Sequence, residues 1–120
     1  MYIEQLQLGN KPRALIFGAG SAGRELAAAL AQNVNTHVIG FLDDDPKIQD
    51  NKINGLTVYN PGNIDKIIMK KRVNEVMLAL PNADRHRRNK ILNLLRKKNV
   101  VVRTLPSYSD LMQGKVNVEN

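Results

Sequence analysis

Three glycines and one aspartate in this chain have the spacing of a nucleotide-binding motif. Gly18, Gly20 and Gly23 form the pattern Gly-x-Gly-x-x-Gly, and Asp43 lies 20 residues beyond the third glycine. In such a motif the first glycine permits a tight turn, the second lets backbone N–H groups approach a diphosphate, and the third lets a helix pack closely on a strand. An acid at this spacing can accept hydrogen bonds from ribose hydroxyl groups. The pattern therefore predicts a site for the ribose and diphosphate of a nucleotide.

The residues around the motif complete the predicted site. A helix that begins at a glycine loop has unpaired N–H groups and a partial positive charge at its start, and both favour a phosphate. The alternative is that the glycines only turn the chain and that the acids at 43–45 form a solvated turn. We predict these cofactor-binding residues: Gly18, Ala19, Gly20, Ser21, Ala22, Gly23, Asp43, Asp44, Pro81, Arg85 and Arg88. We expect no metal site, because the chain has no cysteine and only two histidines. We expect no catalytic residue, because hydride transfer needs a bound substrate and an acid–base group beside the nicotinamide, and the sequence offers no obvious source of either.

The motif does not distinguish between ligands that share a ribose and a diphosphate. NAD, FAD, coenzyme A and UDP-sugars all present these two groups. Because a carboxylate at Asp43 would repel a 2′-phosphate, we expect NAD rather than NADP if either binds. NAD is therefore the first candidate, and a UDP-sugar or coenzyme A are the other ribose-diphosphate ligands that fit the motif.

Arginine side chains are concentrated where a helix does not favour them. Arg85, Arg87 and Arg88 occupy the first turn of a predicted helix, where positive charge opposes the helix dipole. The basic runs at 70–72 and 96–98 differ, because they lie at predicted helix C-termini, where cations are favourable. We therefore predict that one or more of the three arginines, Arg85 and Arg88 in particular, help to hold a phosphate. The alternative is that this turn is a solvated or interface surface.

Short apolar segments that alternate with helical segments must position these residues. The chain has predicted strands at 13–17, 38–42, 57–59, 75–80 and 100–105, and an alanine-rich helix follows the glycine loop. Strands that alternate with helices form a parallel sheet with right-handed crossovers. We predict an α/β, Rossmann-like fold with a parallel sheet, the strand order 3-2-1-4-5 and helices on both faces. In such sheets ligands bind beyond the carboxyl ends of the strands, where the strand order reverses.

Length and composition fit one small globular domain. The 120 residues have a net charge of +7, and no apolar run approaches the ~20 residues of a membrane span. We assign residues 1–12 to a lead-in or linker, residues 13–106 to the Rossmann-like nucleotide-binding domain, and residues 107–120 to a C-terminal helix and linker. A basic chain can bind nucleic acid, but only 4% of these residues are aromatic, so few side chains could stack on bases. We expect a soluble fragment that binds no nucleic acid.

Several separated motifs carry a resemblance to one family. These motifs are the segments 14–24, 40–46, 54–59, 75–81 and 102–106, which include the glycine loop and the Asp-Asp-Asp-Pro turn. In this order they resemble the cytoplasmic linker domain of membrane-bound bacterial nucleotide-sugar 4,6-dehydratases and epimerases of polysaccharide biosynthesis, including UDP-quinovosamine 4-dehydrogenase-type proteins. The resemblance implies a Rossmann-like fold similar to that of coenzyme-A-binding domains.

The resemblance also implies a larger parent protein. Family members carry transmembrane helices before this domain and, after it, a short-chain dehydrogenase/reductase domain with its own NAD(P) site that acts on UDP-linked amino sugars. The Tyr-x-x-x-Lys pair of that catalytic domain is absent here, because Tyr2, Tyr59 and Tyr108 are followed four residues later by Leu, Asn and Met. We therefore expect a non-catalytic domain, excised from an enzyme at the cytoplasmic side of the inner membrane. A homo-oligomer is also compatible with the sequence.

A second function class fits the same motifs. The nucleotide-sugar-binding N-terminal domain of sugar O- and N-acyltransferases has a similar glycine loop and a similar Asp-Asp-Asp-Pro turn, found here at 43–46. Hexapeptide repeats would follow the domain in that class. The motifs within this chain do not decide between the two classes.

Overall fold

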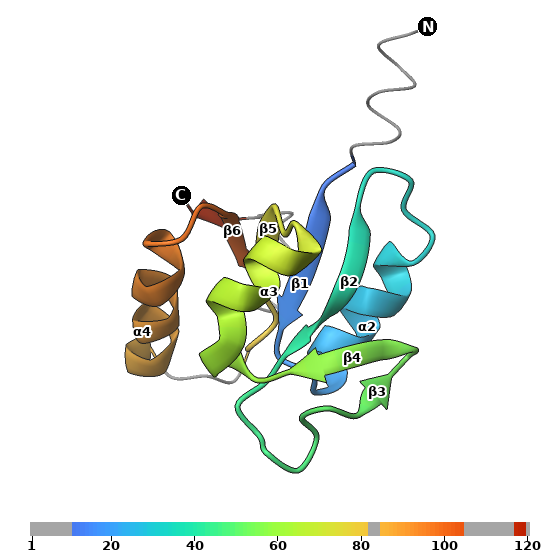
Figure 1. Cartoon of the computed structure of the whole chain (residues 1–120), viewed down its shortest axis with the longest axis horizontal. Helices are drawn as coiled ribbons and strands as arrows, with labels where there is room; N and C mark the ends of the chain where they lie inside the picture. The colour runs from blue at the N-terminus through green and yellow to red at the C-terminus, as the bar shows by residue number, and fades with distance from the viewer. Residues whose placement is uncertain (1–10, 82–84, 105–116, 120) are drawn as a thin grey trace, which may run out of the picture.

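The computed structural model describes residues 11–81, 85–104 and 117–119, which form a sheet covered by helices (Figure 1). The elements in chain order are β1 (Arg13–Phe17), α2 (Ser21–Leu30), β2 (His37–Leu42), β3 (Lys52–Ile53), β4 (Leu56–Tyr59), η1 (Pro61–Asn63), α3 (Ile64–Lys71), β5 (Glu75–Leu78), α4 (Arg85–Arg96), β6 (Val101–Thr104) and β7 (Asn117–Glu119). Strands and helices alternate over most of this length, as the apolar pattern of the sequence predicts.

The strands form one sheet whose centre has the predicted order. Across the sheet the order is β3-β4-β2-β1-β5-β6-β7. The strands β4, β2, β1, β5 and β6 pair in parallel, and they are the strands expected in the order 3-2-1-4-5. Two short strands, β3 and β7, pair antiparallel at the two edges. The sheet is therefore mixed as a whole, which corrects the wholly parallel sheet expected from the sequence.

Helices cover both faces of the sheet, as predicted, and each face has its own core (Figure 1). The helices α3 and α4 cover one face, on which these buried side chains pack together: Leu15, Phe17, Leu42, Ile64, Ile67, Leu78, Ile91 and Leu95. The helix α2 covers the other face, with these buried side chains: Ile16, Ala27, Phe41, Val58 and Ala79. Successive residues of β1 enter different cores, which explains why this strand is apolar throughout.

Local sequence determines where several elements begin. The Asn60 side chain accepts a hydrogen bond from the Gly62 N–H at 2.9 Å, and Pro61 occupies the first turn, so the chain enters η1 and then α3. The antiparallel β3–β4 pair is joined at Asn54 and Gly55, whose φ angles are 54° and 77°. An Asn-Gly pair with two positive φ angles is typical of a tight hairpin turn. These turns place β4 beside β2 and let α3 pack on the face of the sheet that carries Leu15 and Phe17.

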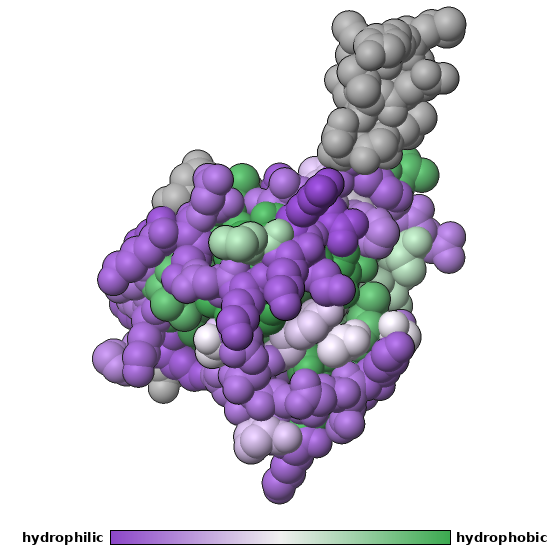
Figure 2. Space-filling view, viewed as in Figure 1, coloured by the Kyte–Doolittle hydropathy of each residue, from purple (hydrophilic) through white to green (hydrophobic). Residues whose placement is uncertain are grey.

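Parts of the predicted domain organisation lie outside the described residues. They include most of the lead-in at 1–12 and the helix expected near 107–114, whereas 117–119 form the strand β7. Over the part of the chain that the structure describes, no helix is long and apolar enough to cross a membrane. The face that carries α3 is covered mainly by hydrophilic side chains (Figure 2). This covering fits a chain with a net charge of +7 and charged helix exteriors.

Candidate functional site

Packing requires the first and third glycines of the loop. Gly18 has a φ of 112°, which L side chains rarely adopt, and a Cβ here would lie 2.5 Å from the carbonyl oxygen of Ala79. A Cβ at Gly23 would lie 1.8 Å from the carbonyl oxygen of Gly18. The Gly18 N–H also donates to the carbonyl oxygen of Leu42 at 2.7 Å, which ties the loop to the end of β2. The fold alone therefore explains these two glycines.

Packing does not require the second glycine. Gly20 has φ −78° and ψ −165°, an extended conformation open to any residue, and a Cβ here would meet no atom within 4 Å. Gly20 is the N-cap residue of α2 and makes no side-chain hydrogen bond to the helix. Serine or aspartate would cap the helix better. A glycine that leaves open space at a helix N-terminus is what the close approach of a ligand to the backbone requires.

A pocket of about 320 Å³ lies over this loop, and we call it the loop pocket. Its walls come from the glycine loop, from Asp43 after β2, from Leu80 and Pro81 after β5, and from Arg87 on α4. In the sheet β1 lies between β2 and β5, so these segments follow the carboxyl ends of three neighbouring parallel strands. The strand order reverses at this point, and Rossmann-like sheets bind their ligands there.

Asp43 is held in place by the backbone around it. Its Oδ2 accepts a hydrogen bond from the Ala19 N–H at 2.8 Å, and its Oδ1 accepts one from the Asp45 N–H at 2.9 Å. The Asp43 N–H donates to the carbonyl oxygen of Tyr59 at 3.1 Å, and the Gln49 amide donates to the Asp43 carbonyl oxygen at 2.8 Å. Each carboxylate oxygen can accept a further hydrogen bond. The carboxylate thus has a fixed orientation and retains acceptor capacity for hydroxyl groups.

Among the residues that the structure describes, Arg87 is the basic side chain that lines the loop pocket. Its Nη2 lies 2.9 Å from Oδ2 of Asp44, in an ion pair whose two side chains are both about half exposed. Arg85 is exposed, Arg88 is half-buried, and neither lines the pocket. Arg87 and Arg88 precede the buried Ile91 by four and three residues, so both flank the apolar stripe of α4. Helix periodicity therefore indicates that Arg87 or Arg88, rather than Arg85, could reach the loop pocket. The packing of α4 on the sheet determines that Arg87 is the one that lines it.

The structure brings just over half of the predicted site residues to one pocket. The predicted residues that line the loop pocket are Gly18, Gly20, Ser21, Ala22, Asp43 and Pro81. Ala19 and Gly23 are buried next to them, and Asp44 lines a neighbouring pocket. Ala79 and Leu80 also line the loop pocket, and the predicted strand order, which places β5 beside β1, is the signal that could have found them.

This arrangement is suited to binding an anion next to a hydroxylated group. The first turn of α2 provides backbone N–H groups and the positive end of a helix dipole, Asp43 provides carboxylate oxygens, and Arg87 provides a cation. Among the described residues, no group of three or more His, Cys, Asp or Glu side chains is arranged to hold a metal ion. The chemistry of the pocket is therefore that of binding a phosphate and a sugar.

Comparison with known proteins identifies the kind of domain. A family model described as a CoA-binding domain matches residues 3–106 of the chain. The chain belongs to this family of CoA-binding domains. A search of curated proteins gives no match.

Solved structures place this CoA-binding domain among Rossmann-like domains. UDP-D-quinovosamine 4-dehydrogenase from Vibrio fischeri is 35% identical with a TM-score of 0.84, and the match covers 92% of this chain and 95% of that chain. RSP, a Rex-family repressor, has a TM-score of 0.67 at 17% identity, and its complex with β-NADH has a TM-score of 0.65 at 17% identity. These two matches cover 92% of this chain and 60% and 61% of the RSP chain, and they show likeness of fold. The comparisons confirm the Rossmann-like fold and the resemblance to a domain of nucleotide-sugar enzymes.

Proposed function

We propose that this domain binds a nucleotide through its ribose and diphosphate. The diphosphate lies against Gly20 and the first turn of α2, and the ribose hydroxyls bind Asp43. The observation that carries this proposal is Gly20, which is glycine at a position where a Cβ would meet nothing within 4 Å and where the backbone is extended. If the glycines only turned the chain, serine, asparagine or aspartate would cap α2 better than glycine at this position. A ligand that approaches the backbone supplies a reason for glycine here.

The proposed ligand is NAD, a UDP-sugar or coenzyme A. Membership of a family described as CoA-binding supports a ligand with a ribose and a diphosphate. The likeness to UDP-D-quinovosamine 4-dehydrogenase supports a nucleotide-sugar context, and the fold is that of RSP, which has been solved with β-NADH. The three ligand classes share the groups that the loop pocket can recognise, so the ribose and diphosphate are the common part of the proposal.

The domain itself binds rather than catalyses in this proposal. A general base must have a proton-accepting group free to approach the reacting atom. Of the described residues, Asp43 is the one carboxylate that lines the loop pocket, and both of its oxygens accept backbone N–H groups at 2.8 and 2.9 Å, which favours a fixed binding role. Catalysis then belongs to another domain of an NAD(P)-dependent nucleotide-sugar dehydratase, epimerase or dehydrogenase.

The proposed parent enzyme acts in surface polysaccharide biosynthesis at the cytoplasmic side of the inner membrane. This part of the proposal rests on the resemblance of the motifs at 14–24 and 40–46 to that family. In the parent, transmembrane helices precede the domain and a short-chain dehydrogenase/reductase domain follows it. The net charge of +7 supports this location, because anionic lipids of the cytoplasmic leaflet attract basic surfaces.

The proposal is tested by calorimetric titration of the chain with NAD, NADP, coenzyme A, UDP and UDP-N-acetylglucosamine. We expect at least one of these ligands to bind with a Kd below about 1 mM, which corresponds to roughly −4 kcal/mol. If none binds at millimolar concentration, the loop is only structural and the proposal is wrong. With NAD and UDP-N-acetylglucosamine together, we expect no turnover, and NAD-dependent turnover by the chain alone would refute the non-catalytic role. Replacing Arg85 or Arg88 by alanine tests their predicted phosphate contact. Unchanged nucleotide affinity in these variants would refute that contact.

A further inference from the structure

The positive charge of this chain is concentrated on the face of the sheet that α3 and α4 cover. The segments 64–72 and 85–98, which contain these two helices, hold 11 of the 18 lysines and arginines and one of the 11 acidic residues. The remaining residues include seven basic and ten acidic ones, so the rest of the chain is slightly acidic. The net charge of +7 therefore belongs to one layer of the molecule.

The helix dipole explains only part of this concentration. Cations are favourable in the last turn of a helix, which accounts for Lys70 and Lys71 at the end of α3. Lys66 lies one turn earlier, four residues from Lys70, and like charges at this spacing destabilise a helix. None of these three lysines forms an ion pair with a described residue, whereas Oδ1 of Asp65 lies 2.8 Å from Nζ of Lys98. The outer side of α3 therefore presents cations that no described residue neutralises.

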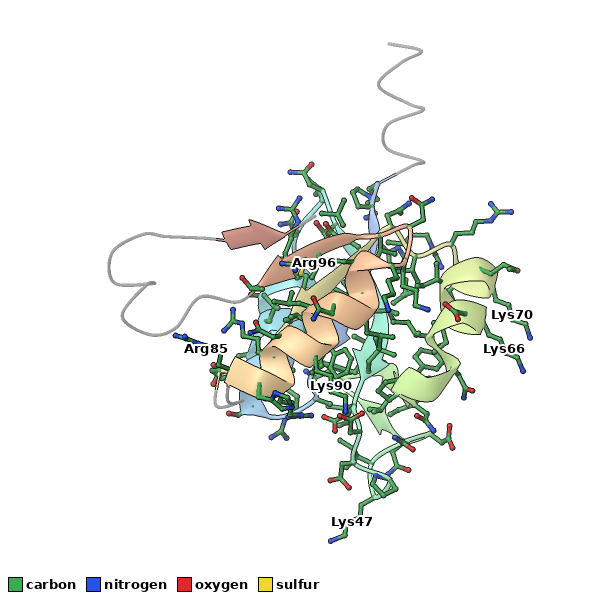
Figure 3. All side chains as sticks on the ribbon, turned by 90° about the vertical axis from the view of Figure 1, so that its left-hand side faces the viewer. Lys47, Lys66, Lys70, Arg85, Lys90 and Arg96 are labelled. Carbon is green, nitrogen blue, oxygen red and sulfur yellow. The ribbon has the colours of Figure 1, made fainter. Side chains whose placement is uncertain are left out.

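An exposed apolar side chain lies among these cations. Met69 is 80% exposed, and it shares the outer side of α3 with Lys66 and Lys70 because it follows the first by three residues and precedes the second. The inner side of the helix belongs to the core, where Ile64 and Ile67 are buried. Figure 2 shows a pale apolar patch over α3 within the hydrophilic covering, and Figure 3 shows Lys66 and Lys70 projecting away from the rest of the domain. The outer side thus combines long basic side chains with an apolar one.

The chain enters the sheet beside this side of α3. Arg13, the first residue of β1, donates from its backbone N–H to Oδ1 of Asn74 at 2.8 Å and from its Nε to the carbonyl oxygen of Lys71. The Asn74 N–H donates in return to the carbonyl oxygen of Arg13 at 2.8 Å. These bonds fix the C-terminal end of α3, with the cations at 70–72, next to the start of β1. The loop pocket lies at the other end of the strands, beyond their carboxyl ends.

We propose that the α3 surface, which consists of Lys66, Met69, Lys70, Lys71 and Arg72, binds an anionic lipid bilayer. The charged groups of the four basic side chains would lie among the lipid phosphates, and Met69 with the lysine stems would contact the apolar region just below the headgroups. A bilayer takes up an apolar side chain as well as cations, whereas the phosphate backbone of a nucleic acid pairs with the cations alone. The inference goes beyond the nucleotide site. It rests on the proposed function only for the membrane location, which it deepens by naming the surface in contact.

Vesicle sedimentation with the purified chain tests the inference. We expect the chain to bind vesicles of phosphatidylcholine with about 30% phosphatidylglycerol at least about tenfold more tightly than vesicles of phosphatidylcholine alone. The variant Lys66→Gln/Lys70→Gln should lose at least about tenfold in affinity for the anionic vesicles, because each basic side chain near such a surface contributes about fivefold. The control Lys47→Gln/Lys52→Gln removes the same charge outside α3 and α4, and Figure 3 shows Lys47 far from Lys66 and Lys70. This control should bind as the wild type does. All four lysines are exposed, and circular dichroism checks that each variant is folded.

A tryptophan reporter locates the contact, because the chain contains no tryptophan of its own. Met69→Trp places a single indole on the α3 surface. Val34→Trp is the matched control, since Val34 is 70% exposed and lies in the connection between α2 and β2. On addition of anionic vesicles, we expect the emission of Met69→Trp to shift to shorter wavelength and to be quenched by brominated lipid. The emission of Val34→Trp should not change.

Several results would overturn the inference. Equal binding to neutral and anionic vesicles, or binding to neither, would exclude an anionic lipid partner. An equal loss of vesicle affinity in the Lys47→Gln/Lys52→Gln control would show a general effect of net charge, and an emission shift in Val34→Trp as large as in Met69→Trp would place the contact elsewhere.

Nucleic acid is the competing partner for a basic surface. Tighter binding of the chain to duplex DNA than to anionic vesicles, with a DNA affinity that Met69→Ser leaves unchanged, would assign the α3 surface to nucleic acid and overturn the inference. The nucleotide titrations described above are independent of these measurements. A chain that binds nucleotide but no vesicle refutes this inference alone, and a chain that binds anionic vesicles but no nucleotide refutes the proposed nucleotide site alone.

Discussion

Gly20→Ala is expected to weaken nucleotide binding at least about tenfold while leaving the domain folded. A Cβ at this position meets no protein atom within 4 Å, so the substitution causes no clash. Alanine restricts the unfolded chain, which stabilises the fold by about 0.4–1 kcal/mol. Alanine is also a poorer N-cap than glycine, by about the same amount. The two effects oppose each other, and the melting temperature should change by only about 2–4 °C.

The effect of Gly20→Ala on binding should be much larger. The added methyl group occupies the space above the first turn of α2, where the diphosphate must reach the backbone N–H groups. One charge-assisted hydrogen bond contributes about 1.5–3 kcal/mol. The loss of a single such bond therefore weakens binding at least about tenfold. The measurement is a calorimetric titration with the tightest ligand of the panel, paired with a thermal melt of the same sample.

Gly23→Ala is the matched control, because it adds the same methyl group three residues along the loop. Its Cβ would lie 1.8 Å from the carbonyl oxygen of Gly18, so helix and strand must separate. Overpacking of this kind costs about 2–3 kcal/mol, which lowers the melting temperature by roughly 10–20 °C. Wild-type affinity in a folded Gly20→Ala variant would refute the diphosphate position. A Gly20→Ala variant that melts as early as Gly23→Ala would refute the distinction between the two glycines.

Three further substitutions test the structure around the site. Asp43→Ala removes the acceptor for the Ala19 N–H, 2.8 Å away, and should lower the unfolding free energy by about 1–2 kcal/mol. It should also weaken nucleotide binding. An unchanged midpoint of urea denaturation would show that this hydrogen bond does not stabilise the loop. Leu95→Ala removes a side chain with 0% exposure and should lower the unfolding free energy, measured by guanidinium denaturation, by about 2–5 kcal/mol. A midpoint equal to that of the wild type would show that Leu95 is not buried between α4 and the sheet. Arg103→Met leaves the carboxylate of Glu75, which is 5% exposed, without its partner at 2.8 Å and should cost about 1–3 kcal/mol. The double variant with Glu75→Gln should recover part of that loss, and a purely additive result would argue against the ion pair.

The sequence was sufficient to predict the centre of the sheet and the place of the site. Strands apolar on both faces, separated by helical segments, permit few topologies once right-handed crossovers are required. The order β4-β2-β1-β5-β6 is the Rossmann-like one among them, and the glycine motif after β1 favoured it. The same order places the glycine loop, Asp43 and Pro81 at one edge, which the loop pocket confirms as neighbours. Their predicted role as ligand contacts stays a prediction.

The edge strands could not be predicted with the same certainty. β3 is Lys52–Ile53 and β7 is Asn117–Glu119, and neither segment is long enough for an apolar periodicity. Each becomes a strand because the neighbouring strand, β4 or β6, offers its unpaired backbone groups. Strand formation of this kind depends on the partner strand, so apolar periodicity does not reveal it, although the Asn54-Gly55 pair is a local signal for the hairpin that contains β3.

The details of the site depended on contacts between distant residues. The motif predicted that Asp43 binds ribose, but not that its carboxylate also accepts the Ala19 N–H from a loop 24 residues earlier. The charge pattern predicted an arginine near the phosphate, but the rotation of α4 on the sheet determines that Arg87 lines the pocket. The distinction between Gly20 and the other two glycines likewise needed coordinates, because all three are identical in the sequence pattern.

The antiparallel direction of β7 has a consequence for how the domain can be joined to other domains. β6 runs toward the end of the strands where the loop pocket lies, and β7 runs antiparallel to it, so Glu119 pairs with Val102. Val102 pairs with Val76, which pairs with Leu15, the third residue of β1. The first residue of β1 therefore lies at the end of the strands away from the loop pocket, and β7 runs toward that same end. A domain joined to other polypeptide at these two positions would keep its ligand-binding end clear of the junctions, which favours reuse of the domain in different protein contexts.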